Sequence, residues 1–268
     1  MTLATHATTP QTITDSAVTL IPGYFTAPVP PTPLVFNAQH DVCPTATVAL
    51  IRFADNIGRA VGYDREQDGR LIQDIFPVRS NELKQVSSSS KVVLGSHTET
   101  AFHPHKPRYV VLLCLRSDPQ AATTYADVAD IVVHLADEDL AVLQTNKFVT
   151  SVDPSFMSNG EPDVQVRVTP LTATGEGWSL IYDQLLMRGT TPRAIAALSA
   201  LHNAVNHTTQ QVGLTAGDIL VIDNHRCVHG RTPFAPRYDG TDRWLKRALV
   251  VQSLDGIDAI ERVIQTRL

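Results

Sequence analysis

The eight-residue run Tyr109–Arg116, YVVLLCLR, constrains the fold of this chain more than any other segment. It is apolar almost throughout, which indicates a strand buried on both faces. Residues 164–168 alternate apolar with polar side chains and predict another strand, and Ile219–Asp223 and 247–252 predict two more. Strands thus dominate the second half of the chain. We expect a mixed, mainly β fold, with a double-stranded β-helix (jelly roll) core and flanking α-helices.

Three segments carry helical signals. The clearest begins after Thr191, a residue type that caps helices, with Pro192 at the first helical position. Residues 45–61 have apolar side chains at helical spacing, and Asp137–Leu143 has acidic residues early, where the helix dipole favours them. Shorter elements are expected as well, namely strands at 71–76, 92–94 and 178–183 and a strand that turns into a helix at 122–132.

The first part of the chain differs in composition from the rest. Residues 1–35 are rich in Thr, Pro and Ala and end in the proline-rich stretch 27–33. This composition suits an extended arm that lies on the surface or is partly disordered. We expect residues 36–268 to form a single jelly-roll domain, a length that is ordinary for one domain of this class.

Charge and cysteine content narrow the class of function. The net charge of -5, without any lysine-rich run, argues against a nucleic-acid partner. The cysteines Cys43, Cys114 and Cys227 are scattered and predict reduced thiols in a cytoplasmic protein. The first residues lack the basic start and apolar core of a signal peptide. No apolar stretch reaches the ~20 residues of a transmembrane helix, so we expect no membrane partner.

A His-x-Glu motif formed by His97 and Glu99 is followed far down the chain by His229. Side chains two positions apart on a strand share a face, so His97 and Glu99 can meet one ion. Two imidazoles and one carboxylate make the facial triad that holds Fe(II) and leaves positions open for oxygen chemistry. His103 and His105 are competing ligands. A closed zinc site would prefer thiolates and four ligands.

Two arginines follow His229. Arg243 comes fourteen residues later, and a guanidinium downstream of a metal site suits a carboxylate co-substrate that also reaches the metal. Arg247 lies four residues beyond Arg243. Positions i and i+4 of a strand face the same side, so we expect both guanidiniums to point into one cavity. The alternative for Arg247 is a solvated charge on a strand.

Three segments, 96–116, 223–234 and 237–247, resemble those of the clavaminate synthase-like Fe(II)/2-oxoglutarate-dependent oxygenases, and in particular the hydroxylases of free arginine and asparagine. The resemblance covers roughly residues 62–254. It implies Fe(II) as the metal, 2-oxoglutarate as co-substrate and O2 as oxidant. It also implies that His97, Glu99 and His229 are the iron ligands.

The resemblance extends to the end of the site that holds the co-substrate. Arg243 is implied to pair with the distal carboxylate of 2-oxoglutarate, a planar anion that a guanidinium binds through two hydrogen bonds. Thr124 is implied to add a hydroxyl to the same carboxylate, and Thr123 remains the alternative. On the substrate side, Ser88, or its neighbour Ser87, is implied to contribute another hydroxyl.

Three further residues are implied to hold the substrate. Arg247 would bind its α-carboxylate, and Gln67, with Glu66 beside it, would bind its α-amine. Asp183 would bind its side chain. The arginine hydroxylases have a second acid two positions before this aspartate, where this chain has Ile181, and this difference counts against arginine as substrate. A turn-capping role is the alternative for Asp183, and an exposed polar loop is the alternative for Gln67.

The reaction implied is hydroxylation of an unactivated β or γ carbon of a free L-amino acid with a polar or basic side chain, with decarboxylation of 2-oxoglutarate to succinate. Glu99 excludes the halogenating relatives, in which a small residue replaces the acid, and leaves desaturation and cyclisation as related outcomes. One alternative is the same chemistry on a carrier-bound or larger amino-acid-derived substrate in a biosynthetic pathway. Two others are a zinc hydrolase and a sandwich that binds a ligand without metal.

Overall fold

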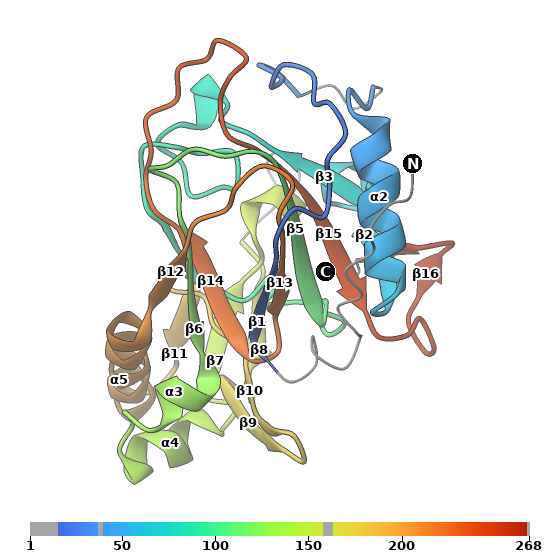
Figure 1. The fold of residues 1–268 in the computed structure, drawn as a ribbon. Coiled ribbons are helices and arrows are strands. Elements are labelled where there is room, and N and C mark those ends of the chain that lie inside the picture. The colour runs from blue at the N-terminus through green and yellow to red at the C-terminus, as the bar shows by residue number, and fades with distance from the viewer. Residues whose placement is uncertain (1–15, 37–39, 158–162, 267–268) are drawn as a thin grey trace.

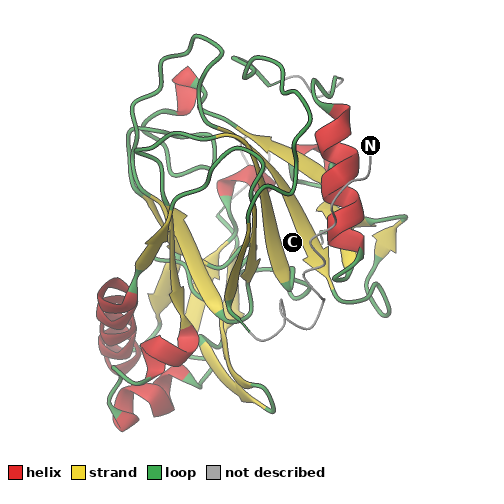
Figure 2. Cartoon of the chain, in the orientation of Figure 1, coloured by secondary structure: helices red, strands yellow, loops and turns green. Residues whose placement is uncertain are grey.

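The computed structural model describes residues 16–36, 40–157 and 163–266, and in it two β-sheets face each other with helices on their outer sides (Figures 1 and 2). The larger sheet has eight strands in the order β1-β13-β5-β15-β2-β17-β16, with β3 also paired to β15. Its strands are β1 (Val18–Ile21), β2 (Arg59–Tyr63), β3 (Ile72–Ile75), β5 (Tyr109–Arg116), β13 (Ile219–Asp223), β15 (Trp244–Val251), β16 (Ala259–Ile260) and β17 (Val263–Ile264).

The facing sheet has four strands in the order β12-β6-β14-β4. They are β4 (Leu94–His97), β6 (Thr123–Asp127), β12 (Gln210–Val212) and β14 (Cys227–Arg231). Two small sheets extend it, formed by β7 (Phe148–Ser151), β8 (Gln165–Val168), β9 (Leu171–Thr174), β10 (Gly177–Leu180) and β11 (Met187–Gly189). The helices are α2 (Pro44–Asp55), α3 (Val128–Val132), α4 (Asp137–Leu143) and α5 (Pro192–Thr208), and the 3-10 turns are η1 (Gln67–Gly69), η2 (Arg79–Asn81) and η3 (Pro154–Phe156).

Strand β5 lies at the centre of the packing, as the apolar run predicts. One face of the strand, with Val111 and Leu113, packs with Leu50 of α2. Its other face, with Val110 and Leu112, packs in the core between the two sheets. Because both faces are covered, the strand needs no polar alternation, and burying each such side chain contributes roughly 1.5–3 kcal/mol. The predicted mainly β fold with flanking helices is confirmed.

Several predicted elements match the structure, whereas two have different bounds: the helix expected over 45–61 and the strand expected over 92–94, which the structure places at Leu94–His97. Helix α5 starts where the sequence predicts, with the Thr191 hydroxyl accepting a hydrogen bond from the Ala194 N–H at 3.2 Å. The helix expected over 45–61 ends at Asp55, because the chain turns and pairs as β2 with β15. Gly58 lies at this approach, and a Cβ there would stand 2.4 Å from the Val251 carbonyl oxygen. Strand pairing thus overrides the helical periodicity.

The described part of the arm is an integral part of the fold. Val18–Ile21 pair antiparallel with β13 at the edge of the large sheet. The rest runs in extended form across the molecule to Phe36, which stacks on Phe76 with ring centroids 5.4 Å apart. The first fifteen residues of the predicted arm lie outside the described residues. Within the described residues there is no helix of the length and hydropathy that crossing a bilayer requires.

Candidate functional site

A cavity of about 440 Å³ opens between the sheets and contains most of the residues that the sequence singles out. His97 and His229 line it from the four-stranded sheet, Arg243 lines it from the loop just before β15, and Arg247 from the middle of β15. Glu99 joins them from the turn beyond β4. A concave pocket with convergent polar groups is the expected form of a ligand site.

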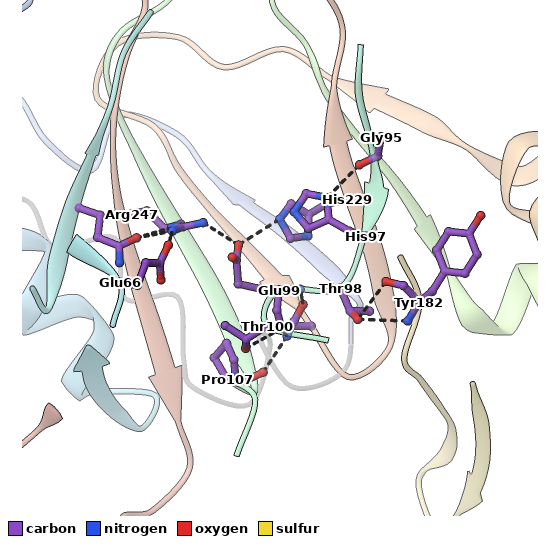
Figure 3. A network of polar contacts seen from close by, with 12 residues as sticks. Glu66, Gly95, His97, Thr98, Glu99, Thr100, Pro107, Tyr182, His229 and Arg247 are labelled. Carbon is purple, nitrogen blue, oxygen red and sulfur yellow. Dashed lines mark hydrogen bonds and ion pairs between the residues drawn. The ribbon is translucent and has the colours of Figure 1, made fainter. Parts of the chain in front are cut away.

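The three predicted metal ligands converge in this cavity. His97 and His229 are direct partners across the antiparallel pair β4–β14, and their ring centroids are 4.5 Å apart (Figure 3). One ligand atom from each of His97, Glu99 and His229 lies within 4.8 Å of the others, and no other group of this kind occurs within the described ranges. The competing ligands are placed elsewhere, since His103 packs against the Tyr63 ring at 5.0 Å.

Glu99 reaches the histidines because its backbone is held in a turn. Its N–H donates to Asn224 Oδ1 at 2.6 Å, and Asn224 Nδ2 donates to the Glu99 carbonyl at 3.1 Å. Thr100, the next residue, has a left-handed φ of 50°. Sequence reasoning missed Asn224, although it stands in the 223–234 segment five residues before His229. It links the backbones around two of the three ligands.

Electrostatics favour the protonation states that bind a metal. Burial alone would raise the pKa of Glu99, but the Arg247 guanidinium and the two imidazoles hold that pKa well below its usual range. Burial lowers the pKa of His229. His97 Nδ1 lies 2.8 Å from the Gly95 carbonyl, which can only accept, so Nδ1 donates to it and Nε2 is the ring nitrogen left for a metal. A charged carboxylate and a His229 imidazole with a lowered pKa suit a divalent cation.

Arg243 is buried, with 6% of its surface exposed, and it faces the cavity. Among the residues that the structure describes, none forms a hydrogen bond or ion pair with its side chain. Burial lowers the pKa of Arg243 to about 10, and the nearby Cys114 and Asp118 offset part of this effect. A buried guanidinium without a partner is costly, so the arrangement suits an anionic ligand.

The choice between the two threonines follows from strand register. Thr123 pairs with Arg231 across β6 and β14, and Tyr125 pairs with His229. Paired residues share a face, so Thr123 points to the cavity, which it lines. Thr124 points to the opposite face, where its Oγ1 would stand 2.9 Å from a Cβ at Gly230. Of the two threonines left open by the sequence, Thr123 rather than Thr124 thus lines the cavity, and the co-substrate role is proposed for Thr123.

Arg247 differs from Arg243 in having three protein partners. Its Nη1 donates to Glu99 Oε2 at 2.7 Å and its Nη2 to Glu66 Oε1 at 2.6 Å. Its Nε donates to Gln73 Oε1 at 2.8 Å, and Nη2 contacts the same oxygen. Burial raises the pKa of Glu66, although Arg247 lowers it. The solvated alternative for Arg247 is excluded, since the residue is buried. Glu66 and Gln73 were missed as its partners.

The predicted substrate-binding residues on the loops also reach the cavity. Gln67 lines it with an Oε1 that is buried and has no hydrogen-bond partner among the described residues. Ser88 lines it too, and its Oγ accepts from Asn81 Nδ2 at 2.9 Å. Arg231, which sequence reasoning missed, holds this loop, since its Nη1 donates to the Ser89 carbonyl at 2.6 Å.

Asp183 caps a turn and also lines the cavity. Its Oδ1 caps a turn by accepting from the Leu185 and Leu186 N–H groups at 2.8 and 2.7 Å. The residue also lines the cavity, whereas Ile181 packs in the core beneath α5 and does not line it. A second aspartate in the cavity wall, Asp153 before η3, was missed because Asp-Pro-Ser is an ordinary turn sequence.

Known proteins share both this sequence and this fold. The model of the family described as taurine catabolism dioxygenase TauD, TfdA family matches residues 33–249. L-lysine 3-hydroxylase from Catenulispora acidiphila is 34% identical over 229 residues, which span 83% of this chain and 63% of that protein, just under two thirds of its length. L-asparagine oxygenase from Streptomyces coelicolor is 35% identical over 228 residues, spanning 84% of this chain and 68% of that protein.

A solved structure gives the same likeness in three dimensions. The crystal structure of asparagine oxygenase in complex with Fe(II), 2S,3S-3-hydroxyasparagine and succinate superposes with a TM-score of 0.86 at 31% identity. The superposition covers 96% of this chain and 85% of that chain. It extends the similarity from separate sequence segments to nearly the whole described fold, so the jelly-roll architecture predicted from the sequence is confirmed.

Proposed function

Because this chain belongs to the TauD/TfdA dioxygenase family, we propose that it is an Fe(II)- and 2-oxoglutarate-dependent oxygenase that hydroxylates a free L-amino acid. The observation that carries the proposal is that one cavity holds both the convergent His97–Glu99–His229 cluster and Arg243, whose side chain no described residue binds. The names of the relatives support the same chemistry.

The residues present fit the metal and the co-substrate. His97, Glu99 and His229 would hold Fe(II), since their ligand atoms converge and their protonation states suit it. Arg243 would pair with the distal carboxylate of 2-oxoglutarate, and Thr123 would add a hydroxyl from the same wall. When bound, Fe(II), 2-oxoglutarate and O2 supply the oxidation of an unactivated C–H bond, with release of succinate and CO2.

The remaining residues of the cavity would bind and orient the amino acid. Arg247 would hold its α-carboxylate, replacing part of its bonding to Glu99 and Glu66. The unpartnered Oε1 of Gln67 would accept from its α-amine. Asp183 would hold its side chain through the oxygen that does not cap the turn. Pinning both ends of the substrate presents its β or γ carbon to the metal, and a misplacement of ~1 Å could cost ~100-fold in rate.

The side chain that this cavity suits is polar or basic. A single half-buried aspartate can accept from an amide, an ammonium or an imidazole, whereas a guanidinium would use two oxygens. The first panel of substrates is therefore asparagine, glutamine, lysine, ornithine, citrulline, histidine and arginine.

Two measurements test the proposal. Anaerobic addition of 2-oxoglutarate to the Fe(II)-loaded protein should give a visible charge-transfer band, which a zinc hydrolase would not give. Oxygen consumption and succinate formation should then depend on one member of the amino-acid panel. If neither the panel nor any standard amino acid stimulates turnover while the band forms, the substrate is a larger or carrier-bound one, and the free-amino-acid proposal is wrong.

The role of Asp183 has its own test. Asp183→Asn keeps an oxygen that can cap the turn and removes the charge, so the preference among side chains should change while uncoupled 2-oxoglutarate turnover continues. Asp130→Asn, on the short helix α3 away from the cavity lining, is the matched control. An unchanged preference in Asp183→Asn would leave the turn cap as its whole role.

A further inference from the structure

The described part of the N-terminal arm ends next to the loop that carries Arg243. After β1 the arm runs to the same end of the molecule as the connection between β14 and β15 (Figure 1). There Thr32 is buried, with 3% of its surface exposed. Its N–H donates to the Gly240 carbonyl at 2.8 Å, and its hydroxyl donates to the Asp242 carbonyl at 2.6 Å. The Asp242 carbonyl belongs to the peptide bond that leads into Arg243.

The hydroxyl of Thr32 also receives a hydrogen bond. Arg116, at the end of β5, donates from Nη1 to Thr32 Oγ1 at 2.6 Å and from Nη2 to the Pro30 carbonyl at 3.2 Å. The hydroxyl therefore relays between a charged donor and a backbone acceptor, so both of its bonds are oriented. Three separate parts of the chain meet at this one side chain.

The loop itself has little freedom to compensate for the loss of this contact. The Asp242 carboxylate accepts from the Arg237 and Tyr238 N–H groups, both at 2.6 Å, which closes the loop into a compact ring. Gly240, with a φ of +89°, turns the chain under the arm, and a Cβ there would stand 3.2 Å from Pro31 Cβ. Because these hydrogen bonds tie the loop together, the contact that places the loop also places the backbone from which Arg243 extends.

We propose that the N-terminal arm, through Thr32, is a clasp that positions Arg243 for 2-oxoglutarate, and that Thr32 is a positioning residue for the co-substrate. The inference rests on the proposed function, since it takes Arg243 as the co-substrate ligand. Thr32 lies immediately before the region 33–249 that the family model matches. Thr32 thus lies just outside the matched region, whereas Arg243, which it would position, lies within it.

The test compares variants of the full-length protein loaded with Mn(II), which binds the triad without turnover. Thr32→Val keeps the shape and the N–H bond but removes the hydroxyl. Calorimetric titration with 2-oxoglutarate should show binding about three- to tenfold weaker, the effect of losing one or two hydrogen bonds. Thr32→Ser restores the hydroxyl and should bind within about twofold of wild type. Thr26→Val, at an exposed threonine of the same arm, is the matched control.

Steady-state kinetics separate positioning from general destabilisation. In Thr32→Val, KM for 2-oxoglutarate should rise while kcat at saturation and KM for the amino acid stay at wild-type values. If Thr32→Val does not fold, Arg116→Gln removes the donor to the same hydroxyl, and we expect a two- to fivefold weakening from the loss of that bond. Wild-type affinity in the folded variants would overturn the clasp alone. Absence of 2-oxoglutarate binding in the wild type would overturn the proposed function and the clasp with it.

Discussion

Arg243 and Arg247 lie four residues apart and line the same cavity, but the groups around their guanidiniums differ. At the Arg243 end, burial lowers the pKa of the arginine, and no described residue forms a hydrogen bond or ion pair with its side chain. At the Arg247 end, Glu99 and Glu66 outweigh burial and raise the pKa of the arginine. The difference supports our proposal that Arg243 pairs with an anionic ligand. Arg247 already has protein partners, and in that proposal it would exchange some of them for the α-carboxylate of the substrate.

The two arginines should differ most in their effect on the stability of the metal-free protein. Arg247→Leu should lower the free energy of unfolding of the metal-free protein by about 3–5 kcal/mol, because it leaves Glu66 and Glu99 buried without their common partner. Urea denaturation with a chelator present measures the loss. The matched control is Arg243→Leu, which should be as stable as the wild type or more stable. An equal loss at both positions would contradict the comparison.

For the affinity for 2-oxoglutarate, by contrast, Arg243 should matter more than Arg247. Arg243→Leu should weaken 2-oxoglutarate binding to the Mn(II)-loaded protein by about 2–4 kcal/mol, because the distal carboxylate loses a buried charged partner. Arg243→Lys should recover only part of this, since an ammonium cannot form the two-pronged pair. Calorimetry measures both. Unchanged affinity in Arg243→Leu would show that the free guanidinium serves another anion.

Asn224 should support metal binding, because its side chain holds the backbone of Glu99. Asn224→Ala removes both hydrogen bonds to the Glu99 backbone and should weaken metal binding by about 10- to 100-fold, the usual cost of losing support behind a ligand. Competition with a chromophoric chelator measures the affinity, and Asn203→Ala on the exposed face of α5 is the control. If the two variants bind metal equally well, the hydrogen bonds from Asn224 do not position Glu99.

The smallest expected effect is in the pH dependence of stability, and it has opposite signs at the two carboxylates that share Arg247. The lowered pKa of Glu99 means that its contribution is present above the ordinary glutamate pKa and is lost as pH falls below it. The raised pKa of Glu66 means that stability falls as pH rises through that pKa. In metal-free protein, Glu99→Gln should therefore reduce the loss on acidification, and Glu66→Gln should reduce the loss on the alkaline side. Slopes of the same sign would contradict this division.

Local pattern sufficed for much of the fold. The buried strand Tyr109–Arg116 and the helix Asp137–Leu143 have the bounds that the sequence predicts, because apolar runs and helix-start signals act within a few residues. The helix expected at 45–61 fails at Gly58, where contact with Val251 decides the backbone. That contact joins segments nearly two hundred residues apart, so no local window contains it.

The residues of the site also fall into two groups, those that the sequence predicts and those that only the structure reveals. Residue types and their spacing predict His97, Glu99, His229 and both arginines as site residues, because metal and carboxylate binding require particular side chains. Thr123 could not be separated from Thr124, since only pairing with Arg231 shows which one faces the cavity. Asn224 and Glu66 carry no motif of their own, and their roles arise from contacts across 125 and 181 residues.

The sequence by itself determined the chemistry that the site can perform, because the types of functional group and the strands that carry them follow from local composition and period. Only the tertiary structure decided how those groups are used. Among the described residues it gave Arg247 three hydrogen-bond partners and Arg243 none. It also turned Thr123 rather than Thr124 into the cavity and brought the arm against the Arg243 loop. These outcomes depend on which distant segments become neighbours, and a charge or a hydroxyl acquires its role from the groups that face it after folding.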